Sequence, residues 1–462
     1  MKRILLFLLL LATTLFAADQ QTMRVDYYHT GNATQEMFSL DRIVIEPLPW
    51  PGNPNHPIDD TNLGKYFFEV RDRASNQVVY SRGFSSVFGE WELLDEAKTS
   101  NKTISESFRF PAPAAPVQVV LKKRDKNNDF QQIWSFVIDP KDIFIDTSKP
   151  TPPGSLIEVQ KMGDPAHKVD LLILGDGYTL QERDKFEKDA RHLSEILFKV
   201  TPFKEHKNDF NVWALCPPAA ESGISRPSQH IYHRNPLGTT YDTFASERYV
   251  LTVDNRAFRD VASYAPYEFV EILVNHRTYG GGGIFNLYAT AAAGSSWIEY
   301  LFVHEFGHHF AGLSDEYFSS GVEGQNIERI EPWEPNVTVL LDPAHLKWKD
   351  LVDPGTPIPT PWAKEAFEKH QAEYQKKRAE IRAQNKPEEV MEQLFLEAKQ
   401  FETKLLSSDQ YSGKVGAFEG ANYSPKGFYR PSEDCIMFAR DEVPFCRVCQ
   451  SAIERVIKLY TQ

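Results

Sequence analysis

The sequence contains few cysteines and no excess of positive charge. Cysteine accounts for only 4 of its 462 residues, and no second pair of Cys or His residues stands at zinc-ribbon spacing from Cys446 and Cys449. Lysine and arginine number 51 against 64 aspartates and glutamates, which gives a net charge of −13 at pH 7. Such a balance offers no positive surface to nucleic acid or to an anionic bilayer. We therefore expect no nucleic-acid partner, and a protein, peptide or sugar as the molecule bound.

Long hydrophobic runs are also absent, except at the start of the chain. Residues 4–18 carry no charge and are rich in leucine, follow a basic start at Lys2 and Arg3, and end in small residues before Asp19. This pattern predicts a signal peptide over residues 1–18 and therefore a secreted or periplasmic protein. The run is shorter than the roughly 20 residues of a membrane-spanning helix, and no later run of hydrophobic residues reaches that length. We expect no membrane span.

The overall composition is that of a folded protein, with 41% hydrophobic, 25% charged and 13% aromatic residues. At about 150 residues per domain, the length predicts two or three domains. Residues 19–147 are rich in β-forming residues with alternating polarity, separated by Gly, Pro, Asn and Asp turns, and this pattern predicts a β-sandwich. A proline-rich stretch follows, and we place a linker over residues 148–167.

From residue 168 to residue 462 the pattern changes to alternating strands and helices. Residues 169–175 form a near-continuous apolar run, which is typical of a buried strand. A capping box at residues 179–182 precedes apolar residues at helical spacing. Residues 361–408 are charged and helix-rich with a break at Pro387, which predicts a solvated pair of helices, either a surface insertion or a lid or docking site for substrate. The alternation predicts an α/β or α+β fold.

The clearest chemistry lies on a helix predicted to begin at a capping box formed by Ser296 and Glu299. His304 and His308 are four residues apart and so share one face of this helix, at the spacing that lets two imidazoles reach one zinc ion. Glu305 lies beside them, where its carboxylate can take a proton from metal-bound water. This is the H-E-x-x-H motif of zinc peptidases.

A third metal ligand is expected just after the helix. Gly312 can end the helix in a left-handed turn that brings the following residues back towards the motif. Asp315 is the favoured third ligand. It stands seven residues after His308, whereas the third ligand of metzincin peptidases stands six residues after the second histidine. The alternatives that stay open are Glu316 and the more distant Glu323 and Glu328.

Three further residues or segments bear on such a site. Met437 follows a loop that could turn beneath the metal, where its side chain would form an apolar floor; packing in the core is the alternative. The glycine-rich residues 279–288 could form an edge strand along which an extended peptide pairs. The alternative is that these glycines only form turns. His309 points away from the ligand pair on a helix, so we predict a packed or exposed side chain.

Three of the four cysteines stand close together near the C-terminus: Cys435, Cys446 and Cys449, whereas Cys216 is remote. A disulfide is chemically permitted in an exported protein. We favour a bond between Cys435 and one of the other two. A zinc site built on the pair Cys446 and Cys449 stays the alternative.

Residues 304–317 resemble the signature of the IgA-peptidase family of metzincin-like zinc metallopeptidases. The other segments that resemble this family are residues 174–179, 348–350, 354–361, 418–435 and 445–449. The resemblance extends from about residue 168 to the C-terminus, and the β-rich part before it is similar to the domain that often precedes the catalytic domain in this family. It implies a multidomain α+β protein: a β-sandwich, then a metzincin-like α/β catalytic domain with a helical insertion at residues 361–408.

The same resemblance implies hydrolysis of peptide bonds by a secreted metalloendopeptidase. One zinc ion per chain would be held by His304, His308 and Asp315, with Glu305 as the general base. Candidates for stabilising the oxyanion, on a loop that the resemblance places near the methionine, are Tyr423, Tyr429 and Arg430. The family's name does not imply that immunoglobulin A is the substrate.

Two other functions stay open at this point. In the first, the chain is a secreted binding or adhesion protein whose metal domain is not catalytic; the intact His304, Glu305 and His308 argue against it. In the second, the same zinc chemistry hydrolyses a non-peptide substrate such as an amidated glycan, and the residues do not separate this activity from peptide hydrolysis.

Overall fold

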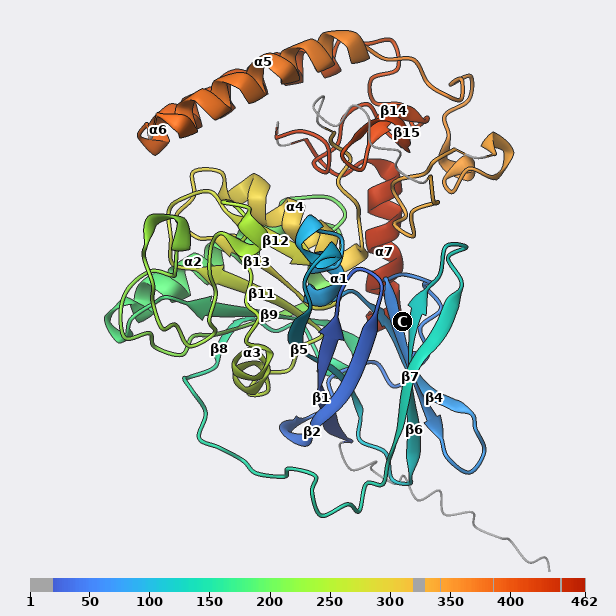
Figure 1. Cartoon of the computed structure of the whole chain (residues 1–462), viewed down its shortest axis with the longest axis vertical. Coiled ribbons are helices and arrows are strands. Elements are labelled where there is room, and N and C mark those ends of the chain that lie inside the picture. Colours follow the sequence, from blue (N-terminus) through green and yellow to red (C-terminus); the bar gives the residue numbers. More distant parts are fainter. Residues whose placement is uncertain (1–19, 319–328, 341, 385, 441–442, 462) are drawn as a thin grey trace, which may run out of the picture.

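The computed structural model describes residues 20–318, 329–340, 342–384, 386–440 and 443–461 (Figure 1). The predicted signal peptide, residues 1–18, lies outside these ranges. Glu323 and Glu328, two of the alternative third ligands, also lie outside them. None of the helices in the described ranges combines the length and the apolar character needed to cross a bilayer.

Two antiparallel sheets form the N-terminal part of the chain. The first has the order β2-β1-β5, with β1 at Gln21–Gly31, β2 at Glu36–Pro49 and β5 at Lys102–Pro111. The second has the order β4-β3-β6-β7, with β3 at Tyr66–Asp72, β4 at Val78–Phe84, β6 at Val117–Arg124 and β7 at Phe130–Ile138. Alternate residues of both sheets share one core, in which the rings of Phe68 and Phe108 stack with centroids 4.7 Å apart. The predicted strand-rich N-terminal domain is confirmed.

A six-stranded mixed sheet is the framework of the rest of the chain, in the order β12-β13-β11-β9-β10-β8. The strands are β8 (Ile157–Gln160), β9 (Val169–Asp176), β10 (Phe210–Leu215), β11 (Phe269–Val274), β12 (Gly281–Ile284) and β13 (Tyr288–Ala292). The four central strands are parallel, and the edge strands β12 and β8 run antiparallel to their neighbours. β8 lies within the stretch predicted as a linker, so the chain joins this sheet before residue 168.

Helices cover both faces of the mixed sheet. On one face, α2 (Arg183–Leu197), α4 (Ile298–Ala311) and α7 (Arg447–Thr461) share a core with the strands. On the other face the core includes α3 (Asn255–Ala262) and α1 (Val87–Trp91). Because α1 belongs to the N-terminal part, that core joins the two parts of the chain. The mixed α/β character predicted for the C-terminal domain is confirmed.

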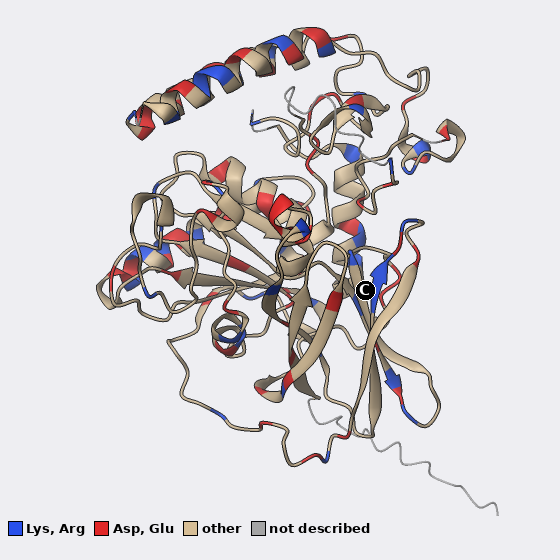
Figure 2. Cartoon of the chain, viewed as in Figure 1, with Lys and Arg blue, Asp and Glu red and all other residues tan. Residues whose placement is uncertain are grey.

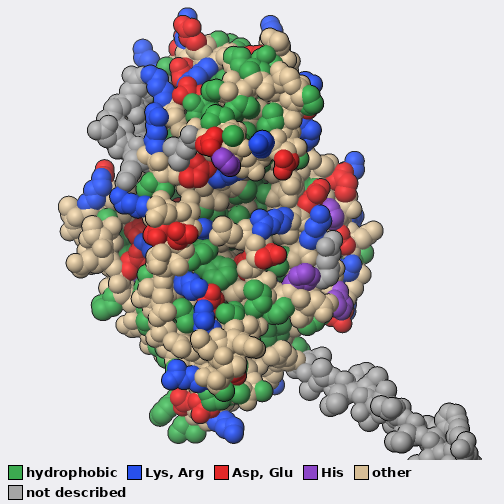
Figure 3. Space-filling model, turned by 90° about the vertical axis from the view of Figure 1, so that its right-hand side faces the viewer, with side chains coloured by type: hydrophobic (Ala, Val, Ile, Leu, Met, Phe, Trp, Pro, Cys, Tyr) green, Lys and Arg blue, Asp and Glu red, His purple; other side chains and the backbone are tan. Residues whose placement is uncertain are grey.

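A pair of helices, α5 (Lys364–Ala383) and α6 (Glu388–Leu406), lies in the stretch predicted to be helix-rich, and α6 begins after Pro387. Acidic and basic residues are interspersed along the ribbon of these helices (Figure 2), while apolar side chains of the pair join the main core. A short hairpin of β14 (Phe418–Ala421) and β15 (Ser424–Arg430) follows. On the face of the molecule in Figure 3, basic and acidic side chains are likewise interspersed among hydrophobic ones.

The start of α4 differs from the sequence prediction. The capping box expected from Ser296 and Glu299 is wrong, because the helix begins at Ile298 after Trp297 and has no side-chain cap. The hydroxyl of Ser296 instead donates to Oε1 of Glu392 on α6 at 2.9 Å. A tertiary contact therefore replaces the local one that the sequence indicated.

Candidate metal centre

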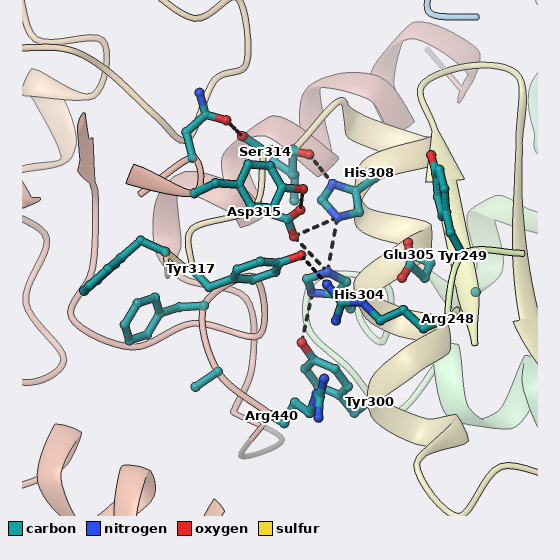
Figure 4. A pocket seen from close by; sticks show the side chains of 18 of the residues that line it. Arg248, Tyr249, Tyr300, His304, Glu305, His308, Ser314, Asp315, Tyr317 and Arg440 are labelled. Carbon is teal, nitrogen blue, oxygen red and sulfur yellow. Dashed lines mark hydrogen bonds and ion pairs between the residues drawn. The ribbon is translucent and has the colours of Figure 1, made fainter. Parts of the chain in front are cut away.

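Helix α4 carries the H-E-x-x-H motif. Nearly all of its residues are buried, because it packs against the mixed sheet and against α7. His304 and His308 lie one turn apart with their rings on the same side of the helix, at a centroid separation of 4.7 Å (Figure 4). The helix ends at Gly312, whose φ of 60° is in the left-handed region that glycine adopts without strain. The chain then turns back towards the two imidazoles.

Three side chains meet at one point beside α4 (Figure 4). The Nε2 atoms of His304 and His308 are 3.1 Å apart. Oδ1 of Asp315 lies 3.1 Å from the Nε2 atom of His304 and 3.2 Å from that of His308. The structure thus brings together the three side chains that the sequence predicts as metal ligands.

The outer nitrogens of the two imidazoles are fixed by backbone carbonyls. Nδ1 of His304 donates to the carbonyl oxygen of Ile436 at 3.0 Å, and Nδ1 of His308 donates to that of Leu313. Burial alone would lower the pKa of His308, but Asp315 raises it to about 9, so a positive charge is favoured at this point. When both rings are neutral, each Nε2 has a lone pair, and the two lone pairs face each other. Such an arrangement is stabilised when a cation lies between the nitrogens.

The residues fit a zinc ion. Imidazole nitrogens and carboxylate oxygens bind zinc at about 2.0–2.1 Å, so two such atoms in a tetrahedral site are about 3.3 Å apart. The three observed separations of 3.1 to 3.2 Å are close to that value. Two neutral nitrogens and one carboxylate oxygen are also the donor types that zinc accepts.

The turn after α4 directs two adjacent carboxylates to opposite sides. Asp315 faces the imidazoles, and its Oδ2 accepts a hydrogen bond from the hydroxyl of Tyr423. Burial alone would raise the pKa of Asp315, but His308 and His304 hold that pKa well below its ordinary value. Glu316 faces a group of cysteines instead. Of the two neighbours, only Asp315 is placed to complete the group formed by the imidazoles.

Glu305 lines the cavity beside the two imidazoles and is not one of the three grouped ligand residues (Figure 4). Burial raises the pKa of its carboxyl group, and the nearby His304 and His308 counteract part of that effect. A carboxyl group with a raised pKa exchanges its proton more readily near neutral pH. This position suits a group that handles protons next to a metal.

The edge strand β12 passes directly over α4. The backbone N–H of Gly281 donates to the carbonyl of Arg248, and its C=O accepts from Val250. By the alternation of an antiparallel ladder, the N–H and C=O of Gly283 face the same outer edge, where no described residue bonds to them. A Cβ at Gly283 would lie 2.2 Å from the carbonyl oxygen of Glu305. Glycine therefore lets the free edge of the sheet approach the motif.

Replacing Gly283 with alanine is expected to lower kcat/KM for a peptide substrate by about 10²-fold, because the added methyl must push β12 away from the groups that act on the peptide. Gly163→Ala is the matched control, since a Cβ there meets only the flexible side chain of Lys168. Steady-state kinetics and thermal melting of both variants test this. Wild-type kcat/KM in the Gly283 variant would show that the strand does not position substrate.

A cavity of about 680 Å³ opens in front of the grouped side chains, within the usual size range of ligand clefts, about 300–1,000 Å³. The N-terminal part of the chain contributes Ser85, Glu90 and Leu93 to its wall. Helices α5 and α6 contribute, among others, Tyr374, Arg378 and Phe395. The N-terminal part therefore helps to form the cleft, although its sequence shows no catalytic cluster.

Two residues at the cavity were missed by the sequence analysis. Nη2 of Arg248 donates to the hydroxyl of Tyr317 at 3.2 Å, across 69 residues of sequence. Both side chains point towards the group formed with His304 (Figure 4). Tyr317 could have been found, since it stands two residues after Asp315 and such residues share a side of an extended segment. Arg248 has no motif around it, and only the pairing of its segment with β12 brings it to the site.

Of the three residues predicted to stabilise an oxyanion, only Tyr423 belongs to the cavity lining among the described residues. Arg430 is fully buried, and its guanidinium donates to the carbonyl oxygens of Gly420 and Glu433 at 2.8 and 2.9 Å. Tyr429 belongs to β15 and lies outside the lining. The predictions for Arg430 and Tyr429 are therefore wrong, and Arg430 is a structural residue.

His309 packs inside the protein, as predicted. Its Nε2 accepts from the N–H of Val270 at 3.1 Å, and its Nδ1 donates to the carbonyl of Ile284 at 3.0 Å. Burial lowers the pKa of His309 to about 3, so the ring is neutral and ties α4 to β11 and β12. Met437 is also buried, with its Sδ 3.1 Å from the place that a Cβ on Gly307 would take. Its role as a floor beneath a metal stays a prediction.

The predicted disulfide is wrong for this structure. All four cysteines are free, and the Sγ atoms of Cys435 and Cys449 lie 3.9 Å apart. A disulfide bond is about 2.05 Å long. Cys446 lies beside this pair, whereas Cys216 is elsewhere and half-buried.

Two family models match the chain. Residues 157–457, which include the motif and most of the cavity lining, match the family described as IgA Peptidase M64. Residues 16–135, which include most of the strand-rich part, match the family described as Peptidase M64 N-terminus. Among curated proteins no significant match is found.

Proposed function

We propose that this chain, which belongs to the IgA Peptidase M64 family, is an exported zinc-dependent metalloendopeptidase that cleaves extracellular proteins. Membership of the family makes the chain a metal-dependent peptidase, and therefore a hydrolase that acts on peptides. The proposal adds the identity of the metal, its ligands, the general base and the location. Export rests on the signal peptide predicted over residues 1–18.

One observation carries the proposal. Nε2 of His304, Nε2 of His308 and Oδ1 of Asp315 form a triangle with sides of 3.1 to 3.2 Å, next to Glu305 in an open cavity. Three protein ligands leave one coordination position free for a reactant, which is the arrangement of catalytic rather than structural zinc sites.

Peptide hydrolysis requires a group that carries a proton and hydrogen-bond donors that stabilise the negative charge developing on the carbonyl oxygen. A zinc ion bound by the three ligands would supply a Lewis acid for the scissile carbonyl and would lower the pKa of a coordinated water to about 7. Glu305 takes the proton from the attacking water and gives it to the leaving nitrogen as the C–N bond breaks. Arg248 and Tyr317 are placed to donate hydrogen bonds to the carbonyl oxygen as its charge develops.

The substrate is proposed to bind as an extended strand. The unpaired N–H and C=O of Gly283 would bond to its backbone, which fixes the peptide's direction without reading its side chains. The mixed wall of aromatic, basic and acidic side chains around the cavity would then select among peptides. Backbone recognition of this kind favours an unfolded or loop segment of a protein over a glycan.

Removal of metal provides the test. The mature protein should cleave an unfolded protein, lose that activity completely with a zinc chelator, and regain it when zinc is added back. An amidated glycan assayed in parallel should stay intact. Cleavage of protein that persists in metal-free enzyme, or hydrolysis of the glycan alone, would contradict the proposal.

A further inference from the structure

A second group of possible metal ligands lies behind the first. The Sγ atoms of Cys435, Cys446 and Cys449 and a carboxylate oxygen of Glu316 all lie within 4.8 Å of one another. Cys446 is 9% exposed and the other three residues are 0% exposed. They come from three places: the turn after α4, the loop before Met437 and the start of α7.

Two separations within this group are close to those of a closed tetrahedral site. The Sγ atoms of Cys435 and Cys449 are 3.9 Å apart, and Sγ of Cys449 is 3.3 Å from Oε1 of Glu316. Around a zinc ion, with bonds of about 2.3 Å to sulfur and about 2.0–2.2 Å to oxygen, the corresponding separations would be about 3.8 and 3.6 Å. Four protein donors fill every tetrahedral position, as in structural zinc sites.

The carboxylate distinguishes a metal site from a disulfide. Oε1 of Glu316 also accepts a hydrogen bond from Nδ2 of Asn336 at 2.9 Å, but Oε2 has no hydrogen-bond partner among the described residues. A buried carboxylate is costly unless charge and hydrogen bonds compensate it. A disulfide would use two sulfurs and leave Oε2 of Glu316 still without a hydrogen-bond partner among the described residues. A divalent cation would satisfy the carboxylate and all three sulfurs together.

The surroundings also suit a negatively charged metal complex. Three thiolates and one carboxylate around a divalent ion carry a net charge of −2. The guanidinium of Arg430 is fully buried and interacts electrostatically with both Glu316 and Cys435. Its positive charge, which also interacts with Glu433 and Asp434, would offset part of that net charge within the core.

We propose that Cys435, Cys446, Cys449 and Glu316 bind a second, structural zinc ion. Soft thiolate ligands in a tetrahedral arrangement select zinc among the common divalent ions. Because Glu316 follows Asp315 directly, the second ion would fix the turn that holds Asp315 against the two imidazoles. The chain would then contain two zinc ions where the sequence predicts one.

Counting metal and thiols in the wild-type protein tests this proposal without any variant. Mature protein is purified with zinc and without reducing agent, analysed for metal, then denatured with a chelator and titrated for thiols. The expected result is two zinc ions and four thiols per chain. One zinc with two thiols per chain would indicate a disulfide in place of the second site. One zinc with four thiols would indicate a thiol cluster that binds no metal. Either result overturns the proposal.

Variants assign each ion to its site. Cys449→Ser should lose one zinc, whereas Cys216→Ser, the matched control outside the group, should keep both. With cobalt in place of zinc, thiolate-to-cobalt charge-transfer absorption should disappear in Cys449→Ser and persist in His308→Ala. Charge-transfer absorption that is absent from the wild type, or unchanged in Cys449→Ser, would overturn the second site while leaving the proposed peptidase site untouched. If Cys449→Ser does not fold, the wild-type spectrum and counts still decide.

Discussion

Replacing Glu305 with glutamine is expected to abolish peptide hydrolysis while the bound zinc is retained. Glutamine has nearly the same shape as glutamate but cannot carry the proton between water and the leaving nitrogen, so kcat should fall by about 10²- to 10⁴-fold. Zinc binding should not change, because Glu305 is not one of the three grouped ligand residues. Rates of peptide cleavage and elemental analysis of the same preparation measure the two effects.

Glu299→Gln is the matched control for that experiment. Glu299 lies on α4 as well, but it is exposed and outside the cavity lining. This variant should cleave peptides at the wild-type rate. Equal losses in the two variants would assign the effect to the helix rather than to the carboxylate, and near wild-type activity in the Glu305 variant would remove Glu305 as the base.

Asp315→Asn is expected to have the second large effect, a loss of both catalytic zinc and activity. The amide removes the one anionic ligand of the three and leaves two neutral imidazoles. Loss of a hydrogen-bond partner of a metal ligand weakens metal binding by about 10- to 100-fold. Loss of the ligand itself should raise the dissociation constant for zinc by more than that. Titration with a competing zinc chelator measures the change.

Tyr423→Phe provides a graded comparison for Asp315→Asn. It removes the hydroxyl that donates to Oδ2 of Asp315, together with its contact to Tyr317, and leaves the ligand in place. Its zinc affinity should fall by about 10- to 100-fold, an intermediate result. If Asp315→Asn binds zinc as tightly as the wild type, the third ligand is another residue and the arrangement described above is not the metal site.

The parts of the site that depend on local periodicity could be predicted from the sequence. His304 and His308 are one helical turn apart, so a single helix is enough to bring their rings together. Gly312 marks the end of that helix for an equally local reason, its left-handed φ. The alternating strands of the N-terminal part and the apolar strand β9 were recognisable because burial imposes its own pattern on each strand.

The parts that depend on tertiary contacts could not be predicted. Asp315 and Glu316 are equivalent in sequence, and only the extended turn after α4 sends them to opposite sides. Ser296 and Glu299 have the spacing of a capping box, but the hydroxyl of Ser296 donates a hydrogen bond to Glu392 on α6 instead. Arg248 reaches the cavity through strand pairing across a long stretch of chain.

The cysteine group also depends on a tertiary contact that could not be predicted from the sequence. Cys446 directly precedes α7 and Cys449 lies in its first turn, and Cys435 is close in sequence, which made a disulfide the natural expectation. The carboxylate of Glu316 reaches them from more than a hundred residues away. No spacing rule connects an acidic residue beside one metal motif with a cysteine pair at the far end of the chain.

Anomalous X-ray scattering at the zinc absorption edge, from crystals of the mature protein, tests the central claim most directly. The claim predicts a zinc peak about 2.0–2.1 Å from Nε2 of His304, Nε2 of His308 and Oδ1 of Asp315, with the carboxylate of Glu305 close by but not bound to the ion. A zinc-loaded crystal with no peak at this position, or with the ion bound by Glu305 in place of Asp315, would contradict it.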